Sequence, residues 1–223
     1  MIGRRVIGLS DISHNYEGLR YHWPLNSKTL GENIASDTRG AANFPNTGIT
    51  TENGLNVPAA SMMTASGLSG INILTISMWI RPQTLSGLKW VFNLARSAVT
   101  VISTTTAHTL LRINGSYFNR YQGAATGMAS WTEILVNTTN FPSGTWRHVA
   151  VQVHPGMRLF ARGANRGHIA QNGNQDTSFP THLNLGTTDS VQHTGAIFYK
   201  DIRIYNRHLT ENEIREINDK GPF

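Results

Sequence analysis

The sequence predicts an all-β fold in which two antiparallel sheets pack as a sandwich, followed by one short C-terminal helix. Large apolar residues alternate with other residues in several segments, which is typical of strands. Gly, Pro and Asn residues separate these segments, and a helical pattern with a start signal occurs at the C-terminal end. The chain has 223 residues and no cysteine, which suits a single sandwich domain whose core needs no disulfide.

The strongest internal strand is predicted over 71–81. Leu74, Ile76, Met78 and Ile80 occupy alternate positions there. Alternate residues of a strand point to the same side, so these four side chains would share one face. A proline follows the run and is expected to end the strand.

Shorter alternating runs predict the other strands. Asn114-Gly115 lies between two such runs and favours a type I′ turn, so residues 108–121 are predicted to form a hairpin. Residues 26–48 are rich in Gly and Asn and are predicted to be a loop. The remaining strands are predicted over 19–25, 55–57, 89–94, 98–103, 131–137, 144–151, 157–163 and 183–186.

The last predicted strand, over 196–205, is the longest run of period-2 alternation. An uninterrupted alternation groups Ile202 and Ile204 with Phe198 and Lys200 on one face. Both faces carry bulky residues, so both are expected to be covered, as in a sandwich of two sheets.

The C-terminal helix has complete start and stop signals. Thr210 is placed as the N-cap, and Glu213, three residues on, completes a capping box. Leu209 and Ile214 have the spacing of a hydrophobic staple. The segment Lys220-Gly221-Pro222 is expected to end the helix.

Several segments carry the motifs of one family. They read TISMWIRP at 75–82, GTWRHVAV at 144–151 and LNLG at 183–186. A closing motif is matched by Gly195, Asp201, Arg203, Tyr205, Asn206, Arg207, Leu209, Thr210, Glu213 and Ile214. Together these segments resemble the laminin G-like (concanavalin A-like) jelly-roll domains. The resemblance runs over about 19–219, and it implies a two-sheet antiparallel jelly-roll domain over 19–223, preceded by an N-terminal arm over 1–18.

Some members of this family bind calcium in their loops, which makes Asp37 a calcium candidate by resemblance. Calcium takes six to eight oxygen ligands, several of them carboxylates. Asp37 has no acidic neighbour in the sequence, and Arg39 would repel a cation. We therefore expect no metal and no other cofactor, and we interpret Asp37 as a turn or cap residue.

The same architecture also carries glycan hydrolases, which must hold two catalytic carboxyl groups. Retaining glycosidases need them about 5 Å apart, and these relatives place them on an E-x-D-x-E strand that this chain lacks. The sequence also has no cysteine nucleophile and no G-x-S-x-G elbow. It therefore predicts a protein that is not an enzyme, with a glycoside hydrolase as the remote alternative.

The nine histidines do not have the close spacings of metal ligands. His148, in the strand at 144–151, is expected to lie in the core or in a sheet. The others, His22 and His193 included, are expected in loops or on the surface.

Basic residues are concentrated in the middle of the chain. Residues 53–175 hold nine basic residues and one acidic residue, a balance that favours an acidic partner. The N-terminal residues lack the apolar run of a signal peptide, and no run is long enough to span a membrane. We expect synthesis in the cytoplasm, no membrane partner and, because no recognised motif is present, no nucleic-acid partner.

The resemblance to laminin G-like domains, which are found on bacteriophage particles and in lectins, implies two functions with different candidate residues. The first is a structural or assembly protein, a surface component of a bacteriophage virion such as a head decoration, fibre or tail protein. It would form a homo-oligomer or contact neighbouring subunits, with the arm residues Arg4, Arg5, Val6 and Ile7 as assembly contacts. The alternative is a lectin-like module that binds a glycan, anionic ones included, through Arg112, Asn114, Tyr117, Arg120 and Tyr121 of the hairpin.

Overall fold

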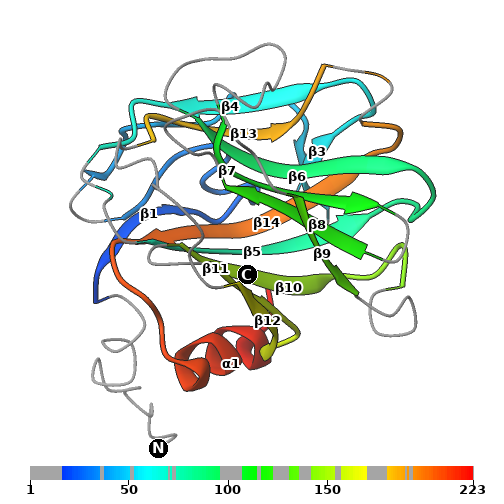
Figure 1. Ribbon diagram of the computed structural model, residues 1–223. Helices are drawn as coiled ribbons and strands as arrows, with labels where there is room; N and C mark the ends of the chain where they lie inside the picture. The colour runs from blue at the N-terminus through cyan, green and yellow to red at the C-terminus, as the bar shows by residue number, and fades with distance from the viewer. Residues whose placement is uncertain are drawn as a thin grey trace, which may run out of the picture.

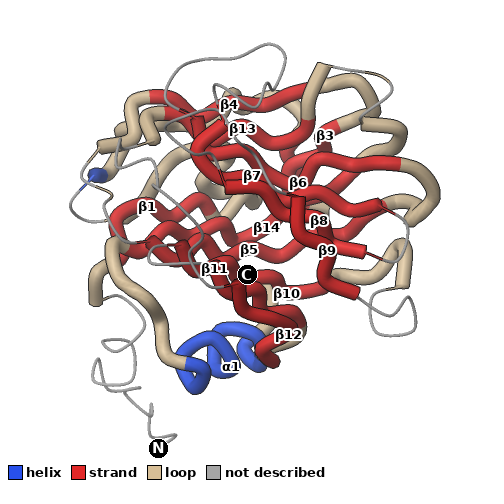
Figure 2. The backbone as a smooth tube through the Cα atoms, in the orientation of Figure 1, coloured by secondary structure: helices blue, strands red, loops and turns tan. Residues whose placement is uncertain are grey.

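The structure is a computed structural model of the whole chain. It describes residues 17–35, 38–50, 53–69, 71, 74–95, 107–114, 117–122, 131–135, 142–153, 157–169, 180–188, 190 and 193–222, and in some strands the backbone alone. Strands make up most of the regular structure, and one helix, α1 (Glu211–Lys220), follows the last strand (Figure 2). No helix in these ranges has the length and hydrophobicity needed to cross a lipid bilayer.

The strands form two antiparallel sheets, as predicted. The larger one, sheet A, has the order β12-β11-β10-β5-β14-β3-β2, with β1 also paired to β14. Sheet B has the order β4-β13-β6-β7-β8-β9. The strands are β1 (Leu19–Trp23), β2 (Ile49–Thr50), β3 (Gly54–Val57), β4 (Met62–Ser66), β5 (Leu74–Pro82), β6 (Leu88–Ala95), β7 (Ala107–Asn114), β8 (Tyr117–Gln122), β9 (Trp131–Leu135), β10 (Arg147–Val153), β11 (Met157–Ala161), β12 (Ala164–Ile169), β13 (His182–Gly186) and β14 (Ile197–Tyr205).

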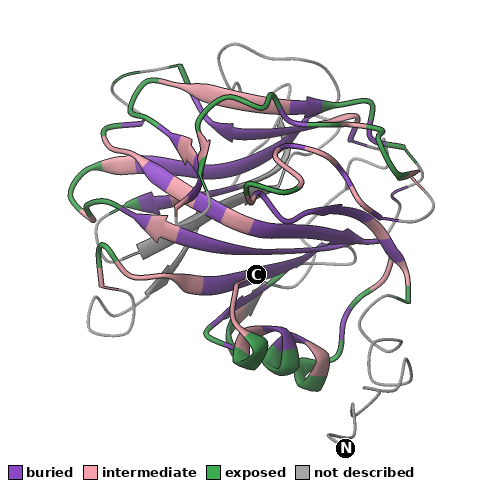
Figure 3. Cartoon of the chain, turned by 180° about the vertical axis from the view of Figure 1, so that it is seen from behind, coloured by how far each residue is buried: buried purple, intermediate pink, exposed green. Residues whose placement is uncertain are grey.

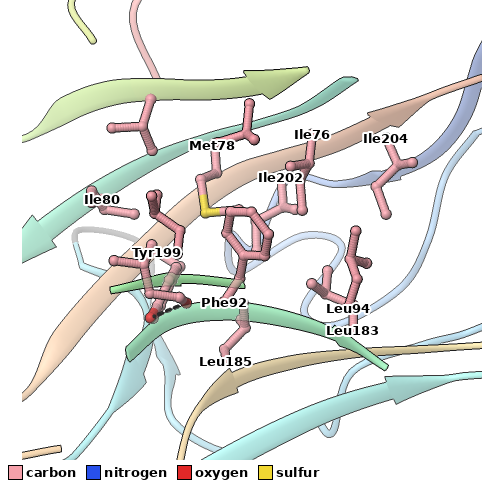
Figure 4. Close-up of a cluster of buried hydrophobic side chains, with 14 of the residues drawn as sticks. Ile76, Met78, Ile80, Phe92, Leu94, Leu183, Leu185, Tyr199, Ile202 and Ile204 are labelled. Carbon is pink, nitrogen blue, oxygen red and sulfur yellow. Dashed lines mark hydrogen bonds between the residues drawn. The ribbon is translucent and has the colours of Figure 1, made fainter. Parts of the chain in front are cut away.

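The main core lies between the two sheets. Sheet A contributes the alternating residues of β5, as predicted, and β10 contributes Val149, Val151 and Val153. Phe92, Leu94, Leu183 and Leu185 of sheet B pack against them (Figure 4). Tyr199 belongs to the same cluster, and its hydroxyl donates a 2.7 Å hydrogen bond to the carbonyl oxygen of Val91, so this buried polar group is satisfied.

A second, smaller cluster covers the outer face of sheet A. Ile214 and Ile217 of α1 and Leu209 before it pack against Phe160 and Tyr205 of the sheet. The helix thus forms a third layer beside sheet A (Figure 1), with its apolar stripe buried and its other side exposed (Figure 3). The predicted capping box at Thr210 is confirmed.

Strand β14 departs from the uninterrupted alternation that the sequence predicted. Arg203 is three positions after Lys200, but their partners on β5, Trp79 and Ser77, are only two positions apart, so one extra residue forms a β-bulge. Asp201 lies in this bulge with φ +50, a conformation that Asp tolerates better than most residues. The bulge moves Ile202 and Ile204 to the inner face, where Ile197 and Tyr199 already lie. Their predicted grouping with Phe198 and Lys200 was wrong.

Two polar partners of Asp201 hold the bulge in place. Arg203 donates two hydrogen bonds to the Asp201 carboxylate, at 2.9 Å and 2.8 Å, and His22 Nε2 lies 2.7 Å from Oδ1. All three residues are buried. Burial opposes ionisation of Asp201, but the hydrogen bond from His22 and the charge of Arg203 still lower the pKa of its carboxyl. The bulge is thus fixed by a buried ion pair in which each carboxylate oxygen has a partner.

Several other details differ from the sequence prediction. Strands β2, β4 and β12 were not predicted. His22 and His193 are buried, so their expected surface positions were wrong, whereas His148 is buried in sheet A as predicted. His22 is buried because it binds Asp201. The predicted strand over 98–103 and residues 1–16 of the arm lie outside the described residues.

Asp201→Asn removes the negative charge while keeping the size and the tolerance for positive φ. We expect the free energy of unfolding to fall by about 3–5 kcal/mol, because Arg203 would be left as a buried charge without its counter-ion. Urea unfolding at neutral pH measures this. Asp219→Asn, on the exposed end of α1, is the matched control and should change stability by less than about 0.5 kcal/mol. Equal effects of the two substitutions would contradict the role of the bulge.

Glu213 makes the start of α1 sensitive to acid. The hydrogen bonds from Arg207, at 2.5 Å and 3.0 Å, and then those of the capping box lower the pKa of Glu213 from 4.5 to about 2. A carboxyl whose pKa is lower in the folded state adds stability above its unfolded pKa, and that stability is lost as the pH falls toward the folded pKa.

We therefore expect Glu213→Gln to cost about 1–2 kcal/mol at neutral pH and much less at about pH 2. Chemical denaturation between about pH 5 and pH 2 measures this narrowing difference. Glu211→Gln, at an exposed position of the same turn, serves as the control. A cost that stays constant with pH would show that the ionised Glu213 does not contribute.

Candidate functional site

The outer face of sheet B carries a row of polar side chains across three neighbouring strands. Thr64 of β4 is opposite Asn184 of β13, and Asn184 is opposite Asn93 of β6. These residues alternate with core residues such as Leu183, Leu185 and Leu94, which point between the sheets. The amide row, Thr64, Asn184 and Asn93, therefore lies on the side of sheet B that faces away from sheet A.

The amide row contains buried polar atoms that have no partner. Thr64 Oγ1 donates a 2.8 Å hydrogen bond to Asn184 Oδ1. Among the described residues, Asn184 Nδ2 and both side-chain polar atoms of Asn93 have no hydrogen-bond partner, although both asparagines are 0% exposed. A buried amide without partners costs about 1–3 kcal/mol for each unsatisfied group. These atoms offer two donor groups and an acceptor to a ligand that can reach them.

The amide row reaches solvent at the edge of sheet B. Strand β4 is the edge strand, and Thr64 is half-buried there. His182, two residues before Asn184, is also half-buried, and its Nδ1 lies 2.7 Å from the hydroxyl oxygen of Thr181. Thr64 and His182 are thus the half-buried neighbours of the fully buried Asn184.

Strand β7 places the first two residues of the predicted hairpin site on this sheet. Arg112 is opposite Trp90 of β6 and is half-buried, whereas Asn114, at the end of β7, is exposed. Trp90 is buried and lies outside the core cluster. The sheet thus carries an indole, a cation and two carboxamides on neighbouring strands, a mixture of groups found in sites that bind polar ligands.

The predicted hairpin exists, but it turns one residue later than expected. Asn114 pairs with position 117, so residues 115 and 116 connect β7 and β8. Tyr117, Arg120 and Tyr121 belong to β8, whose side chains lie outside the described part of the structure. The backbone register places Tyr121 opposite Leu110, which in turn pairs with Asn93. The role of Tyr117, Arg120 and Tyr121 in ligand binding stays a prediction.

The described residues contain no group of three or more metal-ligating side chains. The calcium candidate Asp37 and the arm residues Arg4, Arg5, Val6 and Ile7 lie outside these residues. Their roles therefore stay predictions as well.

A buried serine–histidine pair in sheet A is not arranged as a nucleophile. Ser77 Oγ lies 2.8 Å from His148 Nε2, but both residues are 0% exposed. Burial lowers the pKa of His148 to about 3, so its ring is neutral. The nearby Asp201 carboxylate is bound by His22 and Arg203 instead. The pair satisfies buried polar groups between strands β5 and β10.

A laminin G family model, described as the Concanavalin A-like lectin/glucanases superfamily, matches residues 50–215. The chain belongs to this superfamily. The resemblance seen in the sequence motifs and the predicted jelly-roll fold are thus both confirmed. The chain has no match among curated protein sequences.

Many solved structures share the fold at low sequence identity. The binding domain of Paraclostridial Mosquitocidal Protein 1 is 14% identical, with a TM-score of 0.71 over 93% of this chain and 53% of that one. The binding domain of botulinum neurotoxin serotype D is 10% identical, with a TM-score of 0.70 over 92% and 52%. The serotype D ligand binding domain in complex with N-acetylneuraminic acid is also 10% identical, with a TM-score of 0.70 over 94% and 52%. This chain therefore spans about half the length of these relatives, and at such identity the likeness shows the fold.

Sequence reasoning missed Asn93 and Asn184. Each asparagine stands alone within an apolar run, at an alternate position that would face away from a core. This alternation is the one sequence signal that could have placed both asparagines on the outer face of a sheet. Their proximity depends on the pairing of β6 with β13, which are far apart in the sequence.

Asn93→Leu tests whether the asparagine amide is unsatisfied. The substitution replaces unpaired buried polar atoms with an apolar group of similar size, so we expect the free energy of unfolding to rise by about 1 kcal/mol. Asn184→Leu should gain less, because the Thr64 hydroxyl would lose its acceptor. Urea unfolding of the two variants measures this order. A loss of about 1 kcal/mol or more in Asn93→Leu would show that the amide has a structural partner.

Proposed function

We propose that the chain is a non-catalytic module that binds a glycan on the outer face of sheet B. The observation that carries this proposal is the pair of adjacent, buried asparagines whose amide groups are unpaired. Saccharides present neighbouring hydroxyl groups that both donate and accept hydrogen bonds. A carboxamide has the matching donors and acceptor in one plane.

The position of the amide row also supports sugar binding. Asn184 is held by Thr64 on one side and stands opposite Asn93 on the other. Both asparagines extend from central, paired strands, which hold polar groups in place better than loops do. Arg112 adds a cation on the same sheet, which would favour sugars that carry a carboxylate. The N-acetylneuraminic acid complex of a protein with this fold is consistent with such a ligand.

A non-catalytic role agrees with the acids that the structure describes. Asp201 gives both carboxylate oxygens to His22 and Arg203, and Glu213 caps α1. Hydrolysis of a glycosidic bond needs two carboxyl groups facing one another across the substrate. We therefore propose binding without turnover.

A structural role in a bacteriophage particle is the other proposal for this module, and it rests on the sequence. It is compatible with glycan binding if a virion protein also contacts sugars on a cell surface. Light scattering on the purified chain reads the oligomeric state. A strictly monomeric protein would count against the assembly role and leave the glycan proposal intact.

A glycan array with neutral and sialylated saccharides tests the binding proposal. We expect the wild-type chain to bind a subset of them. Asn93→Leu should lower the affinity for the best ligand by about tenfold or more, a difference of about 1.4 kcal/mol in binding free energy, although the variant folds stably. Titration calorimetry on the best ligand measures the change.

Asn56→Leu is the matched control, since Asn56 is a half-buried asparagine of sheet A whose Oδ1 is also unpaired. It should leave binding unchanged. Tyr117→Ala and Arg120→Ala test the hairpin residues in the same assay. Absence of any bound glycan, or equal effects of Asn93→Leu and Asn56→Leu, would remove the amide row from consideration.

A further inference from the structure

A cluster of half-buried polar and aromatic groups lies on the outer face of sheet A, away from α1. Arg81 of β5 is flanked by two aromatic rings: its guanidinium carbon lies 4.4 Å from the centre of the Phe198 ring and 5.2 Å from that of the Trp146 ring. Arg81 and Phe198 are directly opposite on paired strands. All three residues are half-buried, so the cluster is reached by solvent.

The two rings hold the guanidinium in a fixed orientation. Arg81 Nη2 also donates a 2.6 Å hydrogen bond to Asn53 Oδ1. A guanidinium has five N–H donors, and this is the one hydrogen bond that Arg81 makes within the described residues. The side chain has therefore lost much of its freedom before any ligand arrives, and most of its donors remain available.

No carboxylate of the described residues pairs with Arg81. The acid nearest to this cluster along β14 is Asp201, whose two oxygens are taken by His22 and Arg203. A second cation stands close by, because Lys200 Nζ lies 5.4 Å from the centre of the same Trp146 ring. The cluster thus brings two basic side chains to one indole.

We propose that the Arg81 cluster, made of Asn53, Arg81, Trp146, Phe198 and Lys200, binds the carboxylate or sulfate of an acidic saccharide. The fork of a guanidinium matches the two oxygens of such an oxyanion, and an arginine already fixed by stacking loses little entropy on binding. The edges of Trp146 and Phe198 lie beside the anion and offer apolar surface to the C–H groups of the sugar ring. This site is on the opposite sheet from the amide row and does not depend on the glycan proposed there.

Direct binding to three saccharides tests the proposal. Titration calorimetry at low salt would use an oligogalacturonate, which carries carboxylates, a dextran sulfate fragment, which carries sulfates, and a neutral maltooligosaccharide. We expect at least one acidic saccharide to bind, and we expect its affinity to fall as salt is added. A carboxylate-only or sulfate-only result identifies which oxyanion is bound. Failure of both acidic saccharides to bind the wild-type chain overturns the proposal.

Three variants distinguish a specific site from a general attraction of anions to the positively charged surface. Arg81→Gln should weaken binding by about tenfold or more, and Arg81→Lys should fall between it and wild type, because the charge remains but the fork is lost. Arg158→Gln is the charge-matched control, since Arg158 is an exposed cation elsewhere on sheet A, and it should change affinity by less than about twofold. Equal losses in Arg81→Gln and Arg158→Gln would overturn the proposal.

The same set of variants also tests whether each protein is folded and whether the Arg81 cluster binds independently of the amide row. Thermal melting followed by circular dichroism establishes that each variant is folded. If Arg81→Gln is unstable, Arg81→Lys still tests whether Arg81 contributes to binding. Asn93→Leu reads whether the same saccharide binds the amide row. Loss of binding in Arg81→Gln with binding kept in Asn93→Leu assigns the anion to the Arg81 cluster. If Asn93→Leu loses this binding and Arg81→Gln keeps it, the anion sits on sheet B, and the Arg81 cluster is excluded.

Discussion

The ion pair between Asp201 and Arg203 is the constraint on which the arrangement of sheet A depends. β14 is the centre of that sheet and contacts β1, β3 and β5. Without a bulge, strict alternation along β14 would direct the apolar residues of its two halves to opposite sides of the sheet. The extra residue at position 201 restores the phase, so Ile197, Tyr199, Ile202 and Ile204 all point inward. An aspartate suits the left-handed bulge, and its charge is tolerated inside the protein because Arg203 and His22 satisfy both oxygens.

The same bulge divides the outer face of sheet A into two regions with different roles. On the C-terminal side, Tyr205 lies under α1 and belongs to the second apolar cluster. On the other side, Phe198 and Lys200 stay half-buried beside Arg81 and Trp146. Straight alternation would have placed Ile202 and Ile204 on the face of Phe198, and the core would have lost them. The bulge therefore fills the core and separates a face covered by the helix from one that solvent can reach.

The sequence carried most of the fold because the signals that define it are local. The capping box at Thr210 and the alternation of β5 depend on residues within one element, and both are confirmed. The bulge at Asp201 was missed because both faces of β14 carry bulky residues. The sequence pattern is therefore the same whether or not the inward-facing positions change from odd to even numbers there. The pair Asn93 and Asn184 was missed because it exists through the register of β6 and β13, and a period within one segment carries no information on register. The Arg81 cluster likewise joins residues of β5 and β14 with Trp146, which precedes β10, and these segments are far apart in the sequence.

The contrast between Asp201 and Asn93 is the strongest argument that the outer face of sheet B is adapted to a ligand. Both residues are buried, and an ionised carboxylate is far harder to bury than an amide. Within the described residues, the Asp201 carboxylate nevertheless has three close polar contacts, and the Asn93 side-chain amide has no hydrogen-bond partner. Where stability alone is selected, a leucine at position 93 would serve better than an unpaired asparagine. The unpaired amide of Asn93 beside the partly paired amide of Asn184 is therefore the feature of sheet B that the proposed ligand would explain, because a ligand could complete these hydrogen bonds.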